Sequence, residues 1–304
     1  MAVLVSATAF GTNAIFAKLA YRVGLSTSQT LALRFVLAAV GMWGLALLLR
    51  QNPLRFPRPR LLALLSLGAI VYTGQSLAFF LALRTLPASL VVLIVYIYPS
   101  LVVLAGWLFL RRAVSGWHIV GLGASFAGLF LLVGGAQIQL GVGLVFAIAA
   151  PIIYTGYILV GENVMRAVPA VGASALIMSG AGAAFCVIAA FQGQLAWPAS
   201  TAGWGVVAGI ALIPTMIAVS LFLAGLPRIG AARASLISTW EPVVTVILAV
   251  ALFGDRFSPL QAIGGVLVLL AVIVVQLAHA RYPATDGHDR ARLARPDSER
   301  SGGA

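Results

Sequence analysis

The amino-acid sequence predicts an all-α integral membrane protein with ten transmembrane helices, arranged as two inverted repeats of five. Composition is the first reason, because 62% of the 304 residues are hydrophobic and only 9% are charged. A soluble globule of that composition could not present a wetted surface. The second reason is a series of ten long apolar stretches. The third is a pattern of helix-breaking residues that repeats at an offset of 143, as from Pro99 to Pro242.

Each apolar stretch is long enough to cross a bilayer, since about 20 helical residues span a hydrocarbon layer of about 30 Å. The expected spans are residues 2–20, 30–49, 61–83, 86–110, 115–135, 140–161, 170–191, 203–226, 230–253 and 258–280. The first is the weakest, because it contains Asn13 and closes on Lys18. A cleaved signal peptide is the alternative there. The stretch lacks the basic segment of such a peptide, and losing it would break the repeat pairing.

The internal repeat aligns residues 79–133 with residues 222–276 without a gap. The alignment pairs Phe79 with Phe222, Pro99 with Pro242, Ser115 with Ser258 and Gly121 with Gly264. Because each unit has an odd number of spans, the second unit must enter the bilayer from the opposite side, which makes the repeats inverted. We expect the first unit over 1–136, the second over 137–280, and a disordered cytoplasmic tail over 281–304.

The distribution of cationic residues predicts the orientation. With the N-terminus inside, fourteen of the 19 Lys and Arg residues fall on the inner side: Arg50, Arg55, Arg58, Arg60, Arg111, Arg112, Arg166, Arg228, Arg233, Arg281, Arg290, Arg292, Arg295 and Arg300. The positive-inside rule then places both termini in the cytoplasm. The outer side keeps Lys18, Arg22, Arg34, Arg84 and Arg256. The first three disagree with the rule, although long cationic side chains can reach the membrane interface.

One acidic residue, Glu241, lies deep in an expected span. A charge there costs at least about 2.5 to 3.5 kcal/mol, so the side chain should face the bundle interior or a wet cavity. Pro242 cannot donate to the helix ladder and frees a carbonyl near Ser238. We expect Glu241 to bind a cationic or amino group, or to exchange a proton; a neutral glutamate beside a kink is the alternative. Its repeat counterpart is Tyr98, ahead of Pro99, so the two kinks carry unlike chemistry.

Further candidates share helix faces, since residues three and four apart lie on one face. The stripes are Ser6, Phe10, Asn13 and Ala17; Tyr72, Gln75, Ser76 and Phe79; Tyr154 and Tyr157; and Ser238 and Thr245 around Glu241. Aromatic rings with scattered hydroxyl and amide groups suit an amphipathic organic molecule. Each residue alone is more often an interhelical packing or hydrogen-bonding residue than a ligand contact. The stripes together predict a central cavity for a small-molecule substrate.

Signals for other chemistry are missing from the sequence. The histidines His118, His279 and His288 lie at or beyond the cytoplasmic ends, Cys186 is the single cysteine, and no nucleotide-binding run is present. We therefore expect no metal, no cofactor, no direct use of ATP and no enzyme activity. The net charge of +12 follows topology and does not form a patch for nucleic acid. Small residues such as Gly121, Gly123, Ser125, Gly128, Gly264 and Gly265 predict close helix packing as scaffold or dimer surface, so a monomer and a homodimer both remain open.

Several short motifs add a family resemblance. They are Phe10-Gly11-Thr12-Asn13 followed by Lys18, Leu33-Arg34-Phe35, Glu241-Pro242, and Leu252-Phe253-Gly254-Asp255-Arg256-Phe257-Ser258 followed by Gly264. The chain resembles the EamA-type family of the drug/metabolite transporter (DMT) superfamily. The resemblance implies ten helices in two inverted units, a bacterial inner-membrane location and export of small organic metabolites or amino acids. The chain departs from the family at Leu110-Arg111-Arg112, where an acidic turn is common.

The expected function is a secondary transporter, working by alternating access, that exports small organic metabolites such as amino acids or amphipathic drugs. Its partners would be the solute, membrane lipid and, as one option, coupled protons. An importer remains an alternative, because direction depends on gradients. A membrane-embedded enzyme acting on a lipid or isoprenoid would need paired acids for a metal or a His/Asp cluster, and the sequence shows neither.

Overall fold

The structure, a computed structural model, describes residues 1–135, 141–165 and 168–281. Every regular element in these ranges is helical, and ten helices are long and apolar enough to cross a membrane. They are Ala2–Arg22, Thr27–Leu48, Arg58–Thr85, Ala88–Leu110, Gly116–Gly134, Val142–Val164, Ala170–Phe191, Thr201–Ile229, Arg233–Phe253 and Pro259–Ala278. The predicted all-α membrane fold with ten spans is confirmed. The expected tail beyond 281, the repeat boundary at 136 and the cation Arg166 lie outside the described residues.

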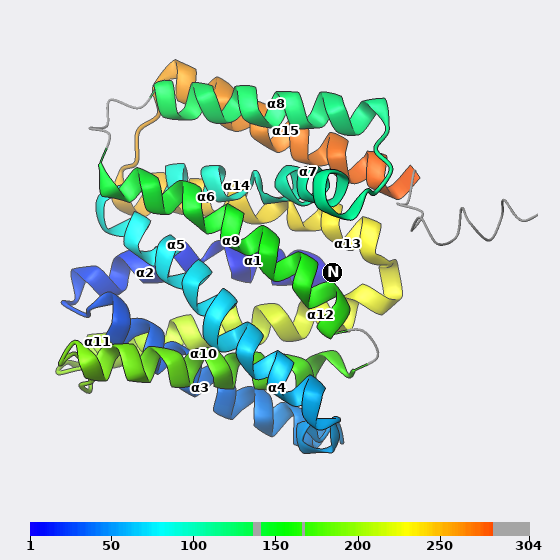
Figure 1. The fold of residues 1–304 in the computed structure, drawn as a ribbon. Helices are drawn as coiled ribbons and strands as arrows, with labels where there is room; N and C mark the ends of the chain where they lie inside the picture. Colours follow the sequence, from blue (N-terminus) through cyan, green and yellow to red (C-terminus); the bar gives the residue numbers. More distant parts are fainter. Residues whose placement is uncertain (136–140, 166–167, 282–304) are drawn as a thin grey trace, which may run out of the picture.

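The helices form three layers (Figure 1). One outer layer is the pair α8 (Gly116–Gly134) and α15 (Pro259–Arg281), and the opposite one is built on α3 (Thr27–Leu48) packed against α10 (Ala170–Phe191). Between them lie α1 (Ala2–Gly11), α2 (Asn13–Arg22), α5 (Thr73–Thr85), α6 (Ala88–Val95), α7 (Tyr98–Leu110), α9 (Val142–Val164), α12 (Ala218–Ile229), α13 (Ala231–Ser238) and α14 (Trp240–Phe253). The remaining elements are η1 (Pro53–Arg55), α4 (Arg58–Ser66), η2 (Leu67–Tyr72), α11 (Thr201–Ala211) and η3 (Leu212–Ile217).

Packing between the halves follows the repeat. The second span contacts the seventh through α3 and α10, and the fifth contacts the tenth through α8 and α15. The third span contacts the sixth through α5 and α9, and the eighth contacts the first through α12 and α1. Exchanging the two halves leaves the first two contacts unchanged and turns the third into the fourth. This exchange is what an internal two-fold relation between two five-helix units requires.

The helix interruptions also occur in corresponding places. The fourth span breaks at Tyr96 and Ile97, between α6 and α7, and the ninth breaks at Thr239, between α13 and α14. Pro99 and Pro242 lie in the first turn of the following helix, where a missing N–H costs least. The third and eighth spans each widen into a π-helical turn, η2 and η3. Such turns displace backbone hydrogen bonds and are frequent at functional sites.

The layer of α8 and α15 is joined by close backbone contact. A Cβ atom added to Gly128 would lie 2.8 Å from the carbonyl oxygen of Gly264, and one added to Gly264 would lie 2.7 Å from that of Gly128. Only glycine allows both helices to approach this closely. Gly123, in contrast, would meet no atom within 4 Å. Gly128 and Gly264 therefore allow α8 and α15 to pack closely as one outer layer.

Candidate substrate cavity

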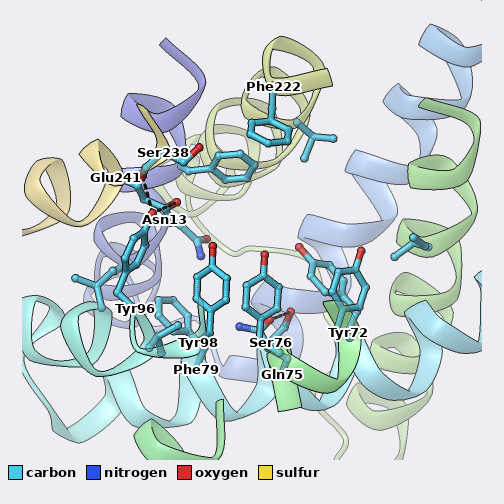
Figure 2. Close-up of a pocket in the computed structure, with 18 of the residues that line it drawn as sticks. Asn13, Tyr72, Gln75, Ser76, Phe79, Tyr96, Tyr98, Phe222, Ser238 and Glu241 are labelled. Carbon is cyan, nitrogen blue, oxygen red and sulfur yellow. Dashed lines mark hydrogen bonds between the residues drawn. The ribbon is translucent and has the colours of Figure 1, made fainter. Parts of the chain in front are cut away.

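A cavity of about 410 Å³ lies between the two halves. All ten residues that the sequence suggested for substrate contact line this cavity: Phe10, Asn13, Tyr72, Gln75, Phe79, Tyr98, Tyr154, Tyr157, Ser238 and Glu241. Figure 2 shows those among them that it labels, such as Asn13, Tyr98 and Glu241, pointing toward one another from separate helices of both halves. Ser76 and Thr245 also line it, whereas Ser6 and Ala17 are fully buried in helix packing. Ser6 donates a hydrogen bond to the Ala218 carbonyl at 2.6 Å.

The break before α14 frees a carbonyl that a tyrosine then satisfies. Pro242 has no N–H for the Ser238 carbonyl, which lies four residues earlier. The Tyr96 hydroxyl donates to that carbonyl at 2.5 Å, and it also lies 3.4 Å from Oε2 of Glu241. Tyr96 belongs to the opposite repeat and was not among the predicted site residues. The two helix breaks are thus joined by one side chain beside the carboxyl group (Figure 2).

The break between α1 and α2 also lies against Glu241. A Cβ atom added to Gly11 would lie 2.8 Å from the backbone carbonyl oxygen of Glu241, so the two backbones touch. Thr245 donates from Oγ1 to the Gly11 carbonyl at 2.8 Å. Asn13 follows at the start of α2, and its Oδ1 atom is buried without a hydrogen-bond partner among the described residues. Asn13 and Glu241 therefore form an acceptor-rich end of the cavity.

A row of five tyrosines forms one wall, and we call it the tyrosine belt: Tyr72, Tyr157, Tyr154, Tyr98 and Tyr96. Successive ring centroids are 5.1, 5.8, 4.7 and 5.8 Å apart in that order, within the range of favourable aromatic pairs. The belt draws on both repeats. Figure 2 shows it running from Tyr72 to the end of the cavity that holds Glu241.

Arg34 corrects an expectation from the charge pattern. It was assigned to the outer side, but the structure buries it at 4% exposure and places it on the cavity wall. The reason is that α3 begins at Thr27, after a capping box between Ser26 and Gln29, so Arg34 lies about 10 Å along the helix. The sequence signal that could have located this helix start is the Ser-x-x-Gln pattern at Ser26 and Gln29, which is typical of a helix N-terminus. A helix placed from residue 27 would have put Arg34 inside the bilayer.

The two ends of the cavity differ. At one end all eight residues of α6 are buried, and α2 packs against α5 and α6. There the Tyr21 hydroxyl donates to the Phe80 carbonyl at 2.7 Å, which ties α2 to α5. At the other end lies α13, the repeat counterpart of α6. Of its described side chains Ala234 alone is buried, and Ser235 lines the cavity. The α6 end of the cavity is therefore packed more tightly than the α13 end.

Comparison with known proteins agrees with the fold and the repeat. The EamA-like transporter family matches residues 1–134 and again residues 141–277. Similar proteins include the uncharacterized transporter YcbK of Bacillus subtilis, 27% identical over 274 residues, which cover 86% of this chain and 87% of YcbK. The uncharacterized transporter YyaM of the same organism is 26% identical over 274 residues, which cover 86% and 88%.

The uncharacterized transporter sll1319 of Synechocystis is 25% identical over 240 residues, which cover 74% of this chain and 70% of that protein. A solved crystal structure matches 93% of this chain and 99% of its own with a TM-score of 0.68 at 22% identity, which shows a shared fold. The double family match covers nearly all of the chain and coincides with the two five-helix halves of the structure. The chain belongs to the EamA-like transporter family.

Proposed function

We propose that this chain is a secondary transporter that exports small organic molecules, such as amino acids, related metabolites or amphipathic drugs. Family membership already makes it a multi-pass membrane transporter rather than an enzyme. The observation that carries the proposal further is the cavity between the two halves, with one end packed more tightly than the other. A transporter that alternates between two faces needs such a site, built by inverted repeats and closed on one side at a time.

A difference in burial between equivalent helices of the two repeats supports alternating access. α6 and α13 occupy corresponding places in the two repeats, yet α6 is wholly buried and α13 is mostly not. The first repeat also holds α2 against α5 and α6. The second half of α9, the counterpart of α2, has no comparable packing on α12 or α13 in the described part of the chain. If the repeats exchanged these conformations, the opening would move to the opposite face around an unchanged site.

The orientation of the chain indicates on which side solute is loaded. We take the less tightly packed α13 end as the open end of the cavity, and α13 lies on the same side of the molecule as the N-terminus (Figure 1). With both termini in the cytoplasm, as the cation distribution favours, the cavity opens inward and loads solute from the cytoplasm. In a bacterial inner membrane this state is the loading state of an exporter. Gradients set the net direction, so import through the same cycle is the second possibility.

The lining defines the solute chemistry. The tyrosine belt and Phe79 offer apolar faces, and Glu241 with Asn13 offers acceptors for an amino group. Glu241 lies in the first turn of α14, where the helix dipole favours a negative charge. Its carboxyl group would bind a cationic group of the solute or exchange a proton during the cycle. Either role makes transport depend on this carboxyl group.

Flux in proteoliposomes tests the proposal. A panel of amino acids and amphipathic amines is first screened by thermal stabilisation of the purified protein, and stabilising solutes are then followed as labelled flux under imposed pH gradients. We expect Glu241→Gln to lower flux by about tenfold or more, since a hydrogen bond to a charged group is worth about 1.5 to 3 kcal/mol.

Glu162→Gln is the matched control, because Glu162 pairs with Arg112 at 2.8 Å outside the cavity. This variant should retain flux. A Glu241→Gln protein with unchanged flux would remove the carboxyl group from the cycle. Wild-type protein that moves no stabilising solute in either direction would overturn the transport proposal itself.

A further inference from the structure

The N-terminus of α6 is capped by a residue of the opposite repeat. The helix follows Pro87, which makes no side-chain hydrogen bond to its first turn. Instead, the backbone N–H of Ser89 donates to Oδ2 of Asp255 at 3.1 Å, and the Ser89 hydroxyl donates to the same oxygen at 2.6 Å. The first N–H groups of a helix have no partner within the helix, and the helix dipole favours a carboxylate beside them. Asp255 therefore provides the cap that the residue before α6 does not.

The loop that carries Asp255 is fixed to the outer layer of α8 and α15. Gly254 adopts the left-handed conformation, with φ of 68°, and ends α14 just before Asp255. At the other end of the loop, the Ser258 hydroxyl donates to the Gly135 carbonyl at 2.8 Å, and Gly135 ends α8. The two hydrogen bonds from Ser89 therefore join α6 to this outer layer. They are links between the two repeats, 166 residues apart in the chain.

α6 is also part of the cavity wall, at the more tightly packed end. Val92 and Val95 line the cavity, and Ser89 lies one turn before Val92, at 2% exposure. Solute can pass this end only if α6 separates from the elements packed on it, among them α14. A movement of α6 away from the loop between α14 and α15 breaks both hydrogen bonds to Asp255. The contact therefore opposes the opening of the α6 end.

The second repeat has no equivalent of this contact. At the offset of 143, the counterpart of Asp255 is Arg112. The counterpart of Ser89 is Ala232. An arginine side chain donates hydrogen bonds and accepts none, so it cannot cap the N–H groups at the start of a helix. Arg112 instead forms an ion pair with Glu162 at 2.8 Å, and α13 begins without a side-chain cap. If the repeats exchanged conformations, the bonds to Asp255 would be lost and no corresponding bonds would form.

We propose that the contact between Asp255 and Ser89 is a one-sided latch, and that Asp255 is a positioning residue of the transport cycle. The latch stabilises the conformation in which the α6 end is tightly packed. Without solute, the transporter therefore rests in this conformation, and solute binding has to offset the loss of both hydrogen bonds before the α6 end opens. This inference rests on the proposed alternating access, and it adds which state is the resting state and which residue sets it.

Cysteine labelling tests the latch in protein without solute. In a Cys186→Ser background, Val92→Cys reports on the α6 end of the cavity and Ser235→Cys on the α13 end. Adding Asp255→Ala should raise the rate of maleimide labelling at position 92 by about fivefold or more, because the loss of a helix cap changes an equilibrium by about that factor. Labelling at position 235 should not become faster. An unchanged rate at position 92 would overturn the proposal. Faster labelling at both positions would also overturn it, because that result indicates local unfolding.

Graded substitutions separate the latch from a general loss of stability. Asp255→Asn keeps an acceptor oxygen without the charge, so its effect on labelling at position 92 should be smaller than that of Asp255→Ala. Ser89→Ala loses the hydroxyl bond and keeps the backbone one, so its effect should also be smaller. Added to Asp255→Ala, it should change nothing further, because the shared acceptor is already absent. Additive effects would contradict the latch. Arg256→Ala, at the exposed next residue, is the matched control and should label as its parent does.

The failure of the latch and the failure of transport are distinguishable. Labelling reads the conformation of the protein without solute, whereas flux in proteoliposomes reads transport. If wild-type protein carries solute and Asp255→Ala labels as its parent does, the latch is wrong and the transport proposal is untouched. If wild-type protein carries no solute, the transport proposal itself fails. Gel filtration shows whether each variant is folded, and Asp255→Asn and Ser89→Ala, the milder changes, keep the test decisive if Asp255→Ala does not fold.

Discussion

At the scale of single residues, Arg111 has a backbone conformation that is unfavourable for an arginine. The same conformation occurs at the corresponding position of the other repeat. Arg111 ends α7 with φ of 52° and ψ of 30°, in the left-handed region. Its repeat counterpart Gly254 ends α14 with φ of 68° and ψ of 29°. Glycine adopts this conformation freely, whereas an arginine pays about 1 kcal/mol for it. The turn geometry is the same in both halves, and only one half has the residue suited to it.

We therefore expect Arg111→Gly to stabilise the protein by about 1 kcal/mol, because the left-handed conformation loses its steric cost. Thermal unfolding in detergent measures the change as a higher midpoint. Arg112→Gly is the control at the neighbouring position, since it removes the ion pair with Glu162 and relieves no left-handed residue. It should not raise the midpoint. A lower midpoint for Arg111→Gly would mean that its side chain holds the turn by other contacts.

At the scale of elements, paired features show which helices are scaffold and which form the cavity. Both α8 and α15 begin with a serine whose N–H donates to a side chain three residues on. Ser115 donates to Nδ1 of His118 at 3.1 Å, and Ser258 donates to Oε1 of Gln261 at 3.0 Å. These caps fix the helix starts. The close glycine contact then locks the two helices side by side, and of the two only α15 reaches the cavity, through Gln276.

Substitution of Gly128 tests this locked layer. Gly128→Ala places a Cβ atom against the backbone of α15, which cannot move without separating the helices, and overpacking of this kind costs about 1 to 3 kcal/mol. Gly123→Ala on the same helix meets open space and should be neutral or slightly stabilising. Thermal midpoints of both proteins in detergent provide the comparison. Equal midpoints would show that α8 and α15 separate easily.

At the scale of the whole molecule, the two halves share a topology and differ in conformation. The tightly packed end of the cavity is formed by α2, α5 and α6 of the first repeat, and the less tightly packed end by the corresponding parts of the second. If the two inverted halves were identical, the conformations open to either face would have the same free energy. Here unlike residues occupy corresponding positions, such as Tyr98 and Glu241. The unlike residues can therefore give the two conformations different free energies.

Cysteine accessibility tests which face is open. Ser235 lines the cavity at the open end, and its repeat counterpart Val92 lines the cavity at the closed end with 4% exposure. In a Cys186→Ser background, a water-soluble maleimide should label Ser235→Cys rapidly from the cytoplasmic side, and Val92→Cys slowly from either side. Solute that drives the cycle should raise labelling at position 92 from the outside. Labelling of position 92 faster than 235 in the absence of solute would contradict the open end assigned here.

Much of the cavity could be predicted because a transmembrane helix exposes few polar residues, and each of these needs an interior position. The spacing of Tyr72, Gln75 and Phe79 marked one face of a helix without reference to any partner. Tyr96 could not be found this way, since its role depends on a carbonyl freed in the opposite repeat. Arg34 was misplaced because the charge count treated it as a loop residue, whereas the start of α3 decides its depth.

The sequence by itself determined the ten spans, their division into two repeats and the residue types that must avoid lipid. These follow from local properties, namely apolar length, helix breakers and the cost of polar groups in hydrocarbon. Only the tertiary structure decided that these residues meet in one cavity, that Arg34 belongs to its wall, and that one end is packed more tightly than the other. Those facts depend on contacts between helices far apart in the chain, and two repeats of one pattern can pack in two different conformations.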